Sequence, residues 1–405
     1  MSRLQHFLKR FELHAFGKWV FLASLVGIVA GLAAIAFDVL GQAVVRYSLT
    51  QFAGYHPLDA MGEHVRFEHQ PESFRPWMIV VVMTVGGLIS GILVYGLAPE
   101  AGGAGADAAI DAFHNKNGKI RARVPFVKIV ASAITLGTGG SGGREGPIGL
   151  IGAGFGSWLA TRLKLSNRER RIMLAAGMGA GIGAIFRAPL AGAVFAGEIL
   201  YSDADLEADV IVPAASASII AYSVYVQSLP SEPRFVPLFG AGLEHTFDSP
   251  VQLPAYALLA VILFAMGAIY IRCLSGTQSV FERLPIVPHL RPAIGAAIAG
   301  LIGVGLYFWF GGNLHLLGSL GTGYGSMQIA VTDAGTVGGS CLIAIALAKI
   351  VTTSLTIGSG GSGGVFGPSV VIGGCTGAAV GLTLQYLWPY VFTEPEAFAV
   401  VGMAG

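Results

Sequence analysis

A single carboxylate stands inside a glycine-rich break between two apolar segments. The break reads GTGGSGGREGP over Gly137–Pro147, with Glu145 directly before the pair Gly146 and Pro147. Glycines leave backbone N–H groups uncovered, and a helix that begins at such a break presents the positive end of its dipole. The N–H groups and the dipole together bind an anion without a fixed cation. We therefore expect an anion site here, where Glu145 mimics the anion and leaves when it is protonated or displaced.

The same break occurs a second time in the chain. GSGGSGGVFGP over Gly358–Pro368 repeats the first copy at one constant offset, which also places Lys349 on Lys128. Phe366 takes the position of Glu145, so only the first copy carries the carboxylate. Both copies end in Gly-Pro. Proline is favourable in the first turn of a helix, because the N–H group that it lacks would have no partner there. The chain therefore contains an internal duplication, whose unit is a break between two apolar helices.

The composition indicates a membrane protein. Of 405 residues, 54% are hydrophobic and 12% are charged, against about 25% charged in soluble domains, and the mean hydropathy is +0.69. The formal net charge of +1 argues against a nucleic-acid-binding protein, which would carry a basic face. The cysteines lie in apolar segments without paired spacing, so we expect neither a disulfide nor a metal site from Cys273, Cys341 and Cys375.

Apolar runs of about 20 residues predict membrane-spanning helices. They lie at Trp19–Phe37, Met78–Leu97, Val210–Val226, Ala255–Ile271 and Ala293–Phe310. We expect one transmembrane domain over residues 1–405, with repeat one at about 76–229 and repeat two at about 293–405. The last residues, Phe398–Gly405, are similar to Met173–Ala180 of the first half. The second repeat is therefore predicted to be incomplete, and the sequence has the form of a chain truncated before its last helices.

The charges that flank the two copies predict opposite orientations. The two apolar segments of the first copy, Val124–Leu136 and Ile148–Leu163, are too short to span a membrane. One basic loop precedes the first segment and another follows the second. This hairpin is therefore expected to enter and leave on the cytoplasmic side. The second copy has no Lys or Arg from Asn313 to Ala348 and is followed by Glu394 and Glu396. We expect an all-α, inverted-repeat fold whose broken helices meet near the bilayer midplane.

Simpler interpretations of the breaks predict exposed loops. Arg144 and Glu145 would form a surface pair if the break were an exposed loop, and the glycine runs would be a flexible linker. A phosphate-binding loop is disfavoured, because neither copy ends in Lys-Ser/Thr or follows a strand. The acidic stretch from Asp203 to Asp209 is typical of a solvated helix junction.

Four motifs resemble the CLC family of chloride channels and proton/anion exchangers. They are GREGP at Gly143–Pro147, GVFGP at Gly364–Pro368, APEAGGAGAD from Ala98 and APLAG from Ala188. The resemblance covers nearly the whole chain and implies a homodimer with one anion pathway per subunit. It also implies a gating role for Glu145. The anion-binding residues that it implies are Ala104, Gly105, Arg144, Glu145, Gly146, Gly364, Val365 and Phe366.

Three departures from the family pattern bear on function. Ala104 stands where the family usually has a serine, so a hydroxyl ligand is absent and a weak preference for chloride is expected. Ile199 stands where the exchangers generally carry an inner, proton-handling glutamate, which makes Glu198, Ile199 and Asp203 the candidate inner proton path. The helix that brings a tyrosine hydroxyl to the anion is not present in this sequence. The site is then expected to consist almost wholly of backbone amides.

We therefore expect this protein to pass small monovalent anions, chloride first, through a passive pathway gated by Glu145. The alternative is proton-coupled anion exchange, with Glu198 or Asp203 replacing the inner carboxylate. A membrane protein that binds or scaffolds without transport is a remote third. No enzymatic activity is expected, and no cofactor other than a bound anion. The expected location is a bacterial inner membrane, with a cytoplasmic N-terminus.

Overall fold

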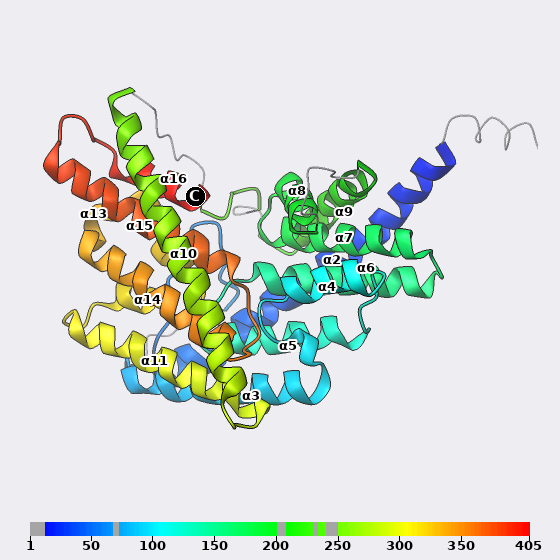
Figure 1. The fold of residues 1–405 in the computed structure, drawn as a ribbon, viewed down its shortest axis with the longest axis horizontal. Coiled ribbons are helices and arrows are strands. Elements are labelled where there is room, and N and C mark those ends of the chain that lie inside the picture. Colours follow the sequence, from blue (N-terminus) through cyan, green and yellow to red (C-terminus); the bar gives the residue numbers. More distant parts are fainter. Residues whose placement is uncertain (1–12, 68–72, 201–207, 231–233, 240–249) are drawn as a thin grey trace, which may run out of the picture. The chain divides into compact units, whose positions relative to one another are not determined.

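The computed structural model describes residues 13–67, 73–200, 208–230, 234–239 and 250–405. All regular elements in these ranges are helices, as predicted (Figure 1). Seven of them are long and apolar enough to cross a membrane: Gly17–Ala53, Pro76–Leu97, Val210–Gln227, Pro250–Arg283, Pro288–Trp309, Gly339–Gly358 and Phe366–Leu387.

The chain divides into two compact units, each assembled from separate stretches of sequence. The first unit comprises residues 1–38, 105–129 and 147–235, and the second comprises residues 39–104, 130–146 and 236–405. The division leaves the prediction of one transmembrane domain with two repeats untested.

The first unit is built around α7 (Asn167–Ile185), which is buried along nearly its whole length. It packs against α8 (Pro189–Leu200) and α9 (Ala208–Gln227), and α4 (Ala106–Asn115) also contacts α7 and α8. Small residues let these helices approach closely. A Cβ on Gly179, for example, would lie 3.1 Å from the carbonyl oxygen of Gly192.

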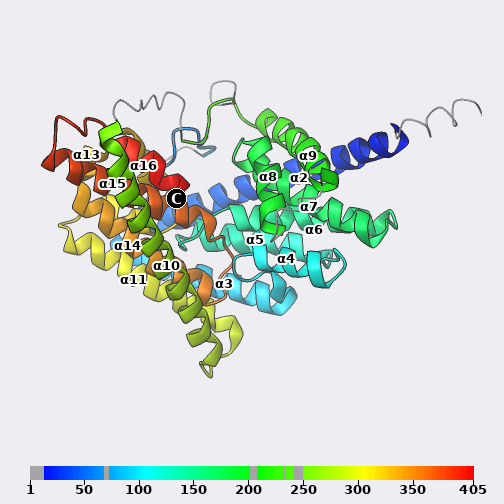
Figure 2. The same ribbon diagram turned by 45° about the horizontal axis from the view of Figure 1, so that its top comes forward.

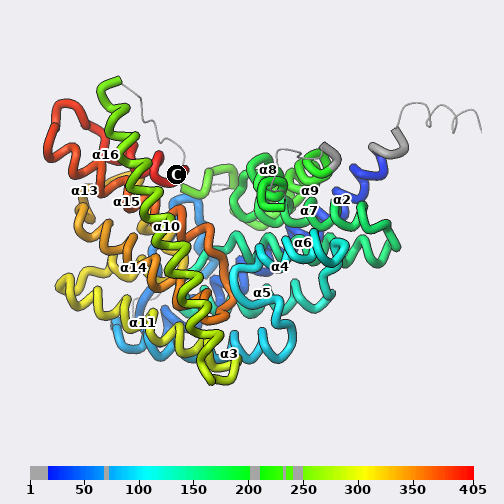
Figure 3. The backbone as a smooth tube through the Cα atoms, viewed as in Figure 1, coloured from blue at the N-terminus to red at the C-terminus, as the bar shows by residue number. Residues whose placement is uncertain are grey.

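The second unit contains most of the long helices. α3 (Pro76–Leu97), α11 (Arg291–Trp309) and α14 (Gly339–Gly358) pack in succession. α10 (Leu253–Arg283) runs across α14 and α15 (Phe366–Leu387), which is plain in two views (Figures 1 and 2). α16 (Pro395–Ala404) packs against α15. The tube in Figure 3 follows α14 into α15 through the second glycine-rich break.

Shorter elements complete the second unit. They are the π-helical turn η1 (Arg46–Ala53), the 3-10 helices η2 (Pro99–Ala101), η3 (Pro250–Gln252), η4 (Pro288–Leu290) and η5 (Leu314–Ser319), and the helices α12 (Tyr324–Thr332) and α13 (Ala334–Val337).

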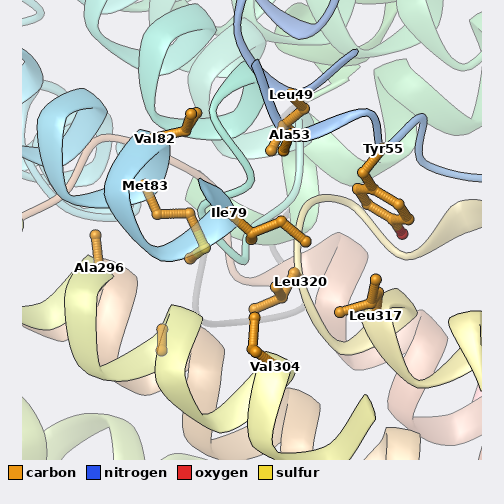
Figure 4. Packing of buried hydrophobic residues seen from close by; sticks show 11 residues of the cluster. Leu49, Ala53, Tyr55, Ile79, Val82, Met83, Ala296, Val304, Leu317 and Leu320 are labelled. Atoms are coloured by element: carbon orange, nitrogen blue, oxygen red, sulfur yellow. The ribbon is translucent and has the colours of Figure 1, made fainter. Parts of the chain in front are cut away.

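A buried apolar cluster joins α3, α11 and η5. Ile79 and Met83 of α3 lie close to Leu320, which directly follows η5, and to Val304 of α11 (Figure 4). Leu317 of η5 belongs to the same cluster. The cluster fixes the chain on the N-terminal side of α12.

Several predicted bounds differ from the observed helices. α2 (Leu13–Val45) extends beyond Trp19–Phe37, and α10 has 31 residues where Ala255–Ile271 was expected. No proline interrupts the polar and charged residues that follow the apolar run at the end of α10, so the helix continues. α5 (Arg123–Gly137) is short, at 15 residues, and α6 (Glu145–Arg162) has 18, beginning three residues earlier than predicted.

Candidate functional site

The two glycine-rich breaks are hydrogen-bonded to each other within the second unit. The N–H of Gly143 donates to the carbonyl of Gly364, and the N–H of Gly364 donates back to Gly143, both at 2.8 Å. The loop after η2 joins them, because Gly103 donates to Gly361 at 3.1 Å and accepts from Gly363 at 3.3 Å. The prediction that the tips of the two copies meet is confirmed.

The duplication is also visible in the backbone conformation of the breaks. Gly139 has φ of 101° and Gly360, its counterpart, has φ of 99°, a region that favours glycine. The next residue in each copy donates to equivalent carbonyls, Gly140 to Thr135 at 2.9 Å and Gly361 to Thr356 at 3.1 Å. The same turn therefore ends the helix before each break.

A helix begins at the end of each break, as the Gly-Pro pairs predicted. α6 starts at Glu145 and α15 starts at Phe366, so the proline is the third residue of each helix. The N–H groups of a first helical turn have no partner within the helix. Gly146 lies so close to the carbonyl oxygen of Ala104 that a Cβ there would collide with it. Ala104 therefore presents a backbone carbonyl toward the start of α6.

The carboxylate of Glu145 is buried at the start of α15. Only 2% of the residue is exposed, and a Cβ placed on Gly367 would lie 2.6 Å from Oε1 and 2.9 Å from Oε2. Oε1 accepts a hydrogen bond from the hydroxyl of Tyr324. Oε2 has no hydrogen-bond partner among the described residues. The interpretation of Arg144 and Glu145 as a surface pair is therefore wrong.

Arg144 points to a different carboxylate. Its guanidinium group forms an ion pair with Glu63, which lies in the loop between η1 and α3. The guanidinium carbon also lies 5.1 Å from the centre of the Tyr324 ring, within the range of a cation–π contact. The direct ion pair of Arg144 is thus with Glu63.

Sequence reasoning missed Tyr324, which belongs to the same cluster as Glu145. The motif GTGYGS around it is a third glycine-rich stretch in an apolar region without Lys or Arg. This motif is the signal that would have pointed to the position. The buried hydroxyl of Tyr324 contacts the central carboxylate, whereas the sequence led us to expect backbone amides almost alone at the site.

The two lysines that set the register of the repeat are both fully buried. The ammonium group of Lys349 donates to the carbonyl oxygens of Gly321 at 2.8 Å and Leu320 at 3.3 Å. Gly321 also binds the first break, since it donates to Gly139 at 2.9 Å and accepts from Gly142 at 3.1 Å. Lys349 therefore connects α14 to the loop that leads into Tyr324.

The remaining residues of the expected site occupy varied positions. Val365 precedes α15, and its carbonyl accepts from the hydroxyl of Tyr270 at 3.1 Å. Phe366 is 43% exposed. Gly105, in the first unit, precedes α4 with φ of 87°. On α8, Glu198 is exposed and Ile199 is half-buried, whereas Asp203 lies outside the described residues.

Comparisons with known proteins identify the same family that the four sequence motifs resemble. A family model described as voltage gated chloride channel matches residues 86–405. The chain is 29% identical over 388 residues to an H(+)/Cl(-) exchange transporter ClcA of Salmonella agona (strain SL483), covering 95% of this chain and 76% of that protein. It is also 29% identical over 386 residues to ClcA of Yersinia pseudotuberculosis serotype IB (strain PB1/+), with coverages of 94% and 75%.

Solved structures share the fold. A slow cyanobacterial Cl-/H+ antiporter superposes with a TM-score of 0.77 at 21% identity, covering 95% of this chain and 84% of that one. A CLC-type fluoride/proton antiporter gives a TM-score of 0.74 at 22% identity, with coverages of 97% and 86%.

Proposed function

Because the chain belongs to the voltage gated chloride channel family of anion transport proteins, we propose that it exchanges chloride, or a similar small anion, for protons. The relatives named above are proton/chloride exchangers. Their names support exchange, the alternative in the sequence interpretation, over the passive pathway that was preferred there. The protein is an integral, multi-pass membrane protein. A bacterial inner membrane, a cytoplasmic N-terminus and a homodimer are part of the proposal.

One observation carries the anion part of the proposal. Glu145, a residue that is only 2% exposed, lies against the first turn of α15. Uncovered N–H groups and the helix dipole favour a negative charge at such a place. The negative group here is on a side chain, which can move. An anion from the surrounding aqueous solution competes with Glu145 for this position.

The proton part of the proposal also begins at Glu145. Tyr324 already donates to Oε1, and Oε2 has no donor among the described residues. A buried carboxylate oxygen without a donor is costly, and a proton on Oε2 removes the charge. The neutral carboxyl group competes less well for the positive helix end than chloride does. Proton uptake and anion entry are therefore coupled at one side chain.

A second acid must carry the proton to the inner side of the membrane. We assign this role to Glu198, which is exposed on α8. An ionised carboxylate facing lipid is costly, so such a residue in a membrane protein usually faces water or protein. Asp203 is retained as the alternative because it follows α8 by a few residues.

The proposal is tested with purified protein in liposomes. A fixed chloride gradient is imposed across the vesicles, and a pH electrode records the lightly buffered outer medium. We expect steady proton movement against its own gradient, opposite to chloride and in a fixed ratio to it. Glu198→Gln should abolish the proton movement and leave chloride movement measurable.

Passive anion conduction is the second candidate, and Ile199 favours it. At the position where exchangers of the CLC family generally carry an inner glutamate, this chain has Ile199. An isoleucine cannot bind a proton. Chloride movement without any proton movement in the same liposomes would support conduction and contradict exchange. Absence of both movements would contradict anion transport by this protein.

A further inference from the structure

We propose that the hydroxyl group of Tyr324 is a side-chain ligand of the transported anion, which takes over the hydrogen bond that Glu145 now accepts. This inference rests on the proposed function, because it assumes that an anion replaces the carboxylate. Tyr324 lies outside the four motifs that resemble the CLC family. As a ligand, it would help to determine which anions bind.

The position of the Tyr324 hydroxyl is fixed by its surroundings independently of Glu145. The residue is 1% exposed. The Arg144 guanidinium group covers its ring, and Phe239 meets the ring edge-on, with centroids 5.7 Å apart and planes at 88°. Both contacts act on the ring and leave the hydroxyl free to point at Oε1 of Glu145. The donor therefore stays in place when the carboxylate moves.

The backbone that carries Tyr324 is also firmly held. Gly323 precedes α12 with φ of 77°, a conformation that favours glycine. Gly321 is bound by Lys349 and by both Gly139 and Gly142 of the first break. Leu317 and Leu320 anchor the preceding residues in the apolar cluster (Figure 4). These contacts tie Tyr324 to the first break itself, so the hydroxyl and the helix starts keep one geometry.

Departure of Glu145 leaves this hydroxyl without an acceptor. A buried donor without a partner costs free energy, whereas a hydrogen bond to a charged acceptor is stronger than one between neutral groups. An anion that enters the vacated position meets the hydroxyl and the N–H groups of the first turn of α15. Tyr324 thus supplies the hydroxyl ligand that Ala104 lacks.

The hydroxyl also gives the site a basis for selection. A single fixed O–H donor binds most strongly to an acceptor atom that carries the whole negative charge. Chloride concentrates its charge on one atom, while nitrate spreads it over three oxygens. We therefore expect chloride to gain more than nitrate from Tyr324, and the discrimination between them to fall when the hydroxyl is removed.

Anion binding to the purified protein in detergent tests the role directly. Glu145→Ala vacates the position, and sodium chloride or sodium nitrate is titrated calorimetrically into this variant and into the double variant that also carries Tyr324→Phe. Phenylalanine keeps the ring and its contacts with Arg144 and Phe239. We expect the double variant to bind chloride about tenfold more weakly or worse, with a smaller change for nitrate. Equal chloride affinities would overturn the proposal.

A matched control separates a ligand from a structural residue. Tyr55 is another buried tyrosine of the second unit and belongs to the apolar cluster, so Glu145→Ala with Tyr55→Phe should bind chloride like Glu145→Ala alone. If the Tyr324 double variant does not fold, the single variant Tyr324→Phe is measured for its chloride-to-nitrate flux ratio in liposomes. A reduced ratio supports the role, and an unchanged ratio refutes it.

Failure of anion transport itself, as distinct from failure of proton exchange alone, gives a different result. Wild-type and Glu145→Ala protein would then neither bind nor move chloride, which contradicts both proposals. Normal binding in Glu145→Ala and in its Tyr324→Phe double variant would refute only the role of Tyr324.

Discussion

Tyr324 donates its hydroxyl hydrogen to the buried carboxylate of Glu145, although 179 positions separate the two residues in the chain. The hydrogen bond joins the start of α12 to the start of α6. It holds a charge-bearing side chain at a helix end where an anion is expected to bind. Variants at Glu145, Gly367 and Lys349 should perturb this arrangement or one of its supports.

Replacing Glu145 with glutamine removes the charge that competes with the anion. We expect Glu145→Gln to raise passive anion flux, to end proton movement and to flatten the dependence of flux on pH. Chloride efflux from liposomes at several pH values measures all three. Flux and pH response equal to those of the wild type would remove Glu145 from the gate.

Adding one methyl group at Gly367 should displace the same carboxylate. The Cβ of Gly367→Ala would lie 2.6 Å from Oε1 of Glu145, and the end of a flexible side chain can yield. We therefore expect a folded protein whose flux resembles that of Glu145→Gln. Gly305→Ala in α11 is the control, because nothing lies within 4 Å of its Cβ. Wild-type flux in Gly367→Ala would show that the carboxylate does not need this position.

Removing the ammonium group of Lys349 should loosen the loop before Tyr324. Lys349→Met removes the buried donor to the carbonyl oxygens of Gly321 and Leu320. Gly321 still accepts from Gly142, so the Leu320 carbonyl loses its donor, which costs about 1–3 kcal/mol. We expect a lower midpoint of thermal unfolding in detergent. Lys119→Met, in the exposed basic loop, should leave the midpoint unchanged, and equal midpoints for both variants would contradict the anchoring role.

A charge pair in the first unit predicts how stability depends on pH. Glu169 lies in the first turn of α7, outside the candidate spans. The hydrogen bond from Lys18, followed by that from the Ser166 backbone, lowers the pKa of Glu169 from 4.5 to about 2. Because the folded-state pKa is lowered, the stabilisation is complete well above pH 4.5 and is lost as the pH falls toward 2.

The variant Glu169→Gln checks this sign. At pH 7 it should unfold at a lower temperature than the wild type, and the difference should shrink as the pH is lowered from about 5 toward 2. Lys18→Met should lower the midpoint in the wild-type background but have little effect beside Glu169→Gln, because the two residues then no longer interact. A difference that grows at low pH would contradict the pairing.

Much of the architecture could be predicted from sequence because it depends on local patterns. The duplicated break was recognised from GTGGSGG and GSGGSGG, and the structure gives Gly139 and Gly360 nearly the same φ. The Gly-Pro pairs located the starts of α6 and α15. Glycine and proline restrict the backbone wherever they occur, so their spacing carries this information without any knowledge of the fold.

The partners of the charged residues were decided only by the tertiary structure. Arg144 is adjacent to Glu145 in sequence, yet its guanidinium group binds Glu63, and Glu145 is contacted by Tyr324. These pairs join segments that are far apart in the chain, and no local pattern specifies which segments meet. The sequence by itself determined where the chain breaks and which break carries the acid. Packing of α12 and the loop before α3 against the first break decided which groups surround that acid, because side-chain partners follow from the positions of distant helices.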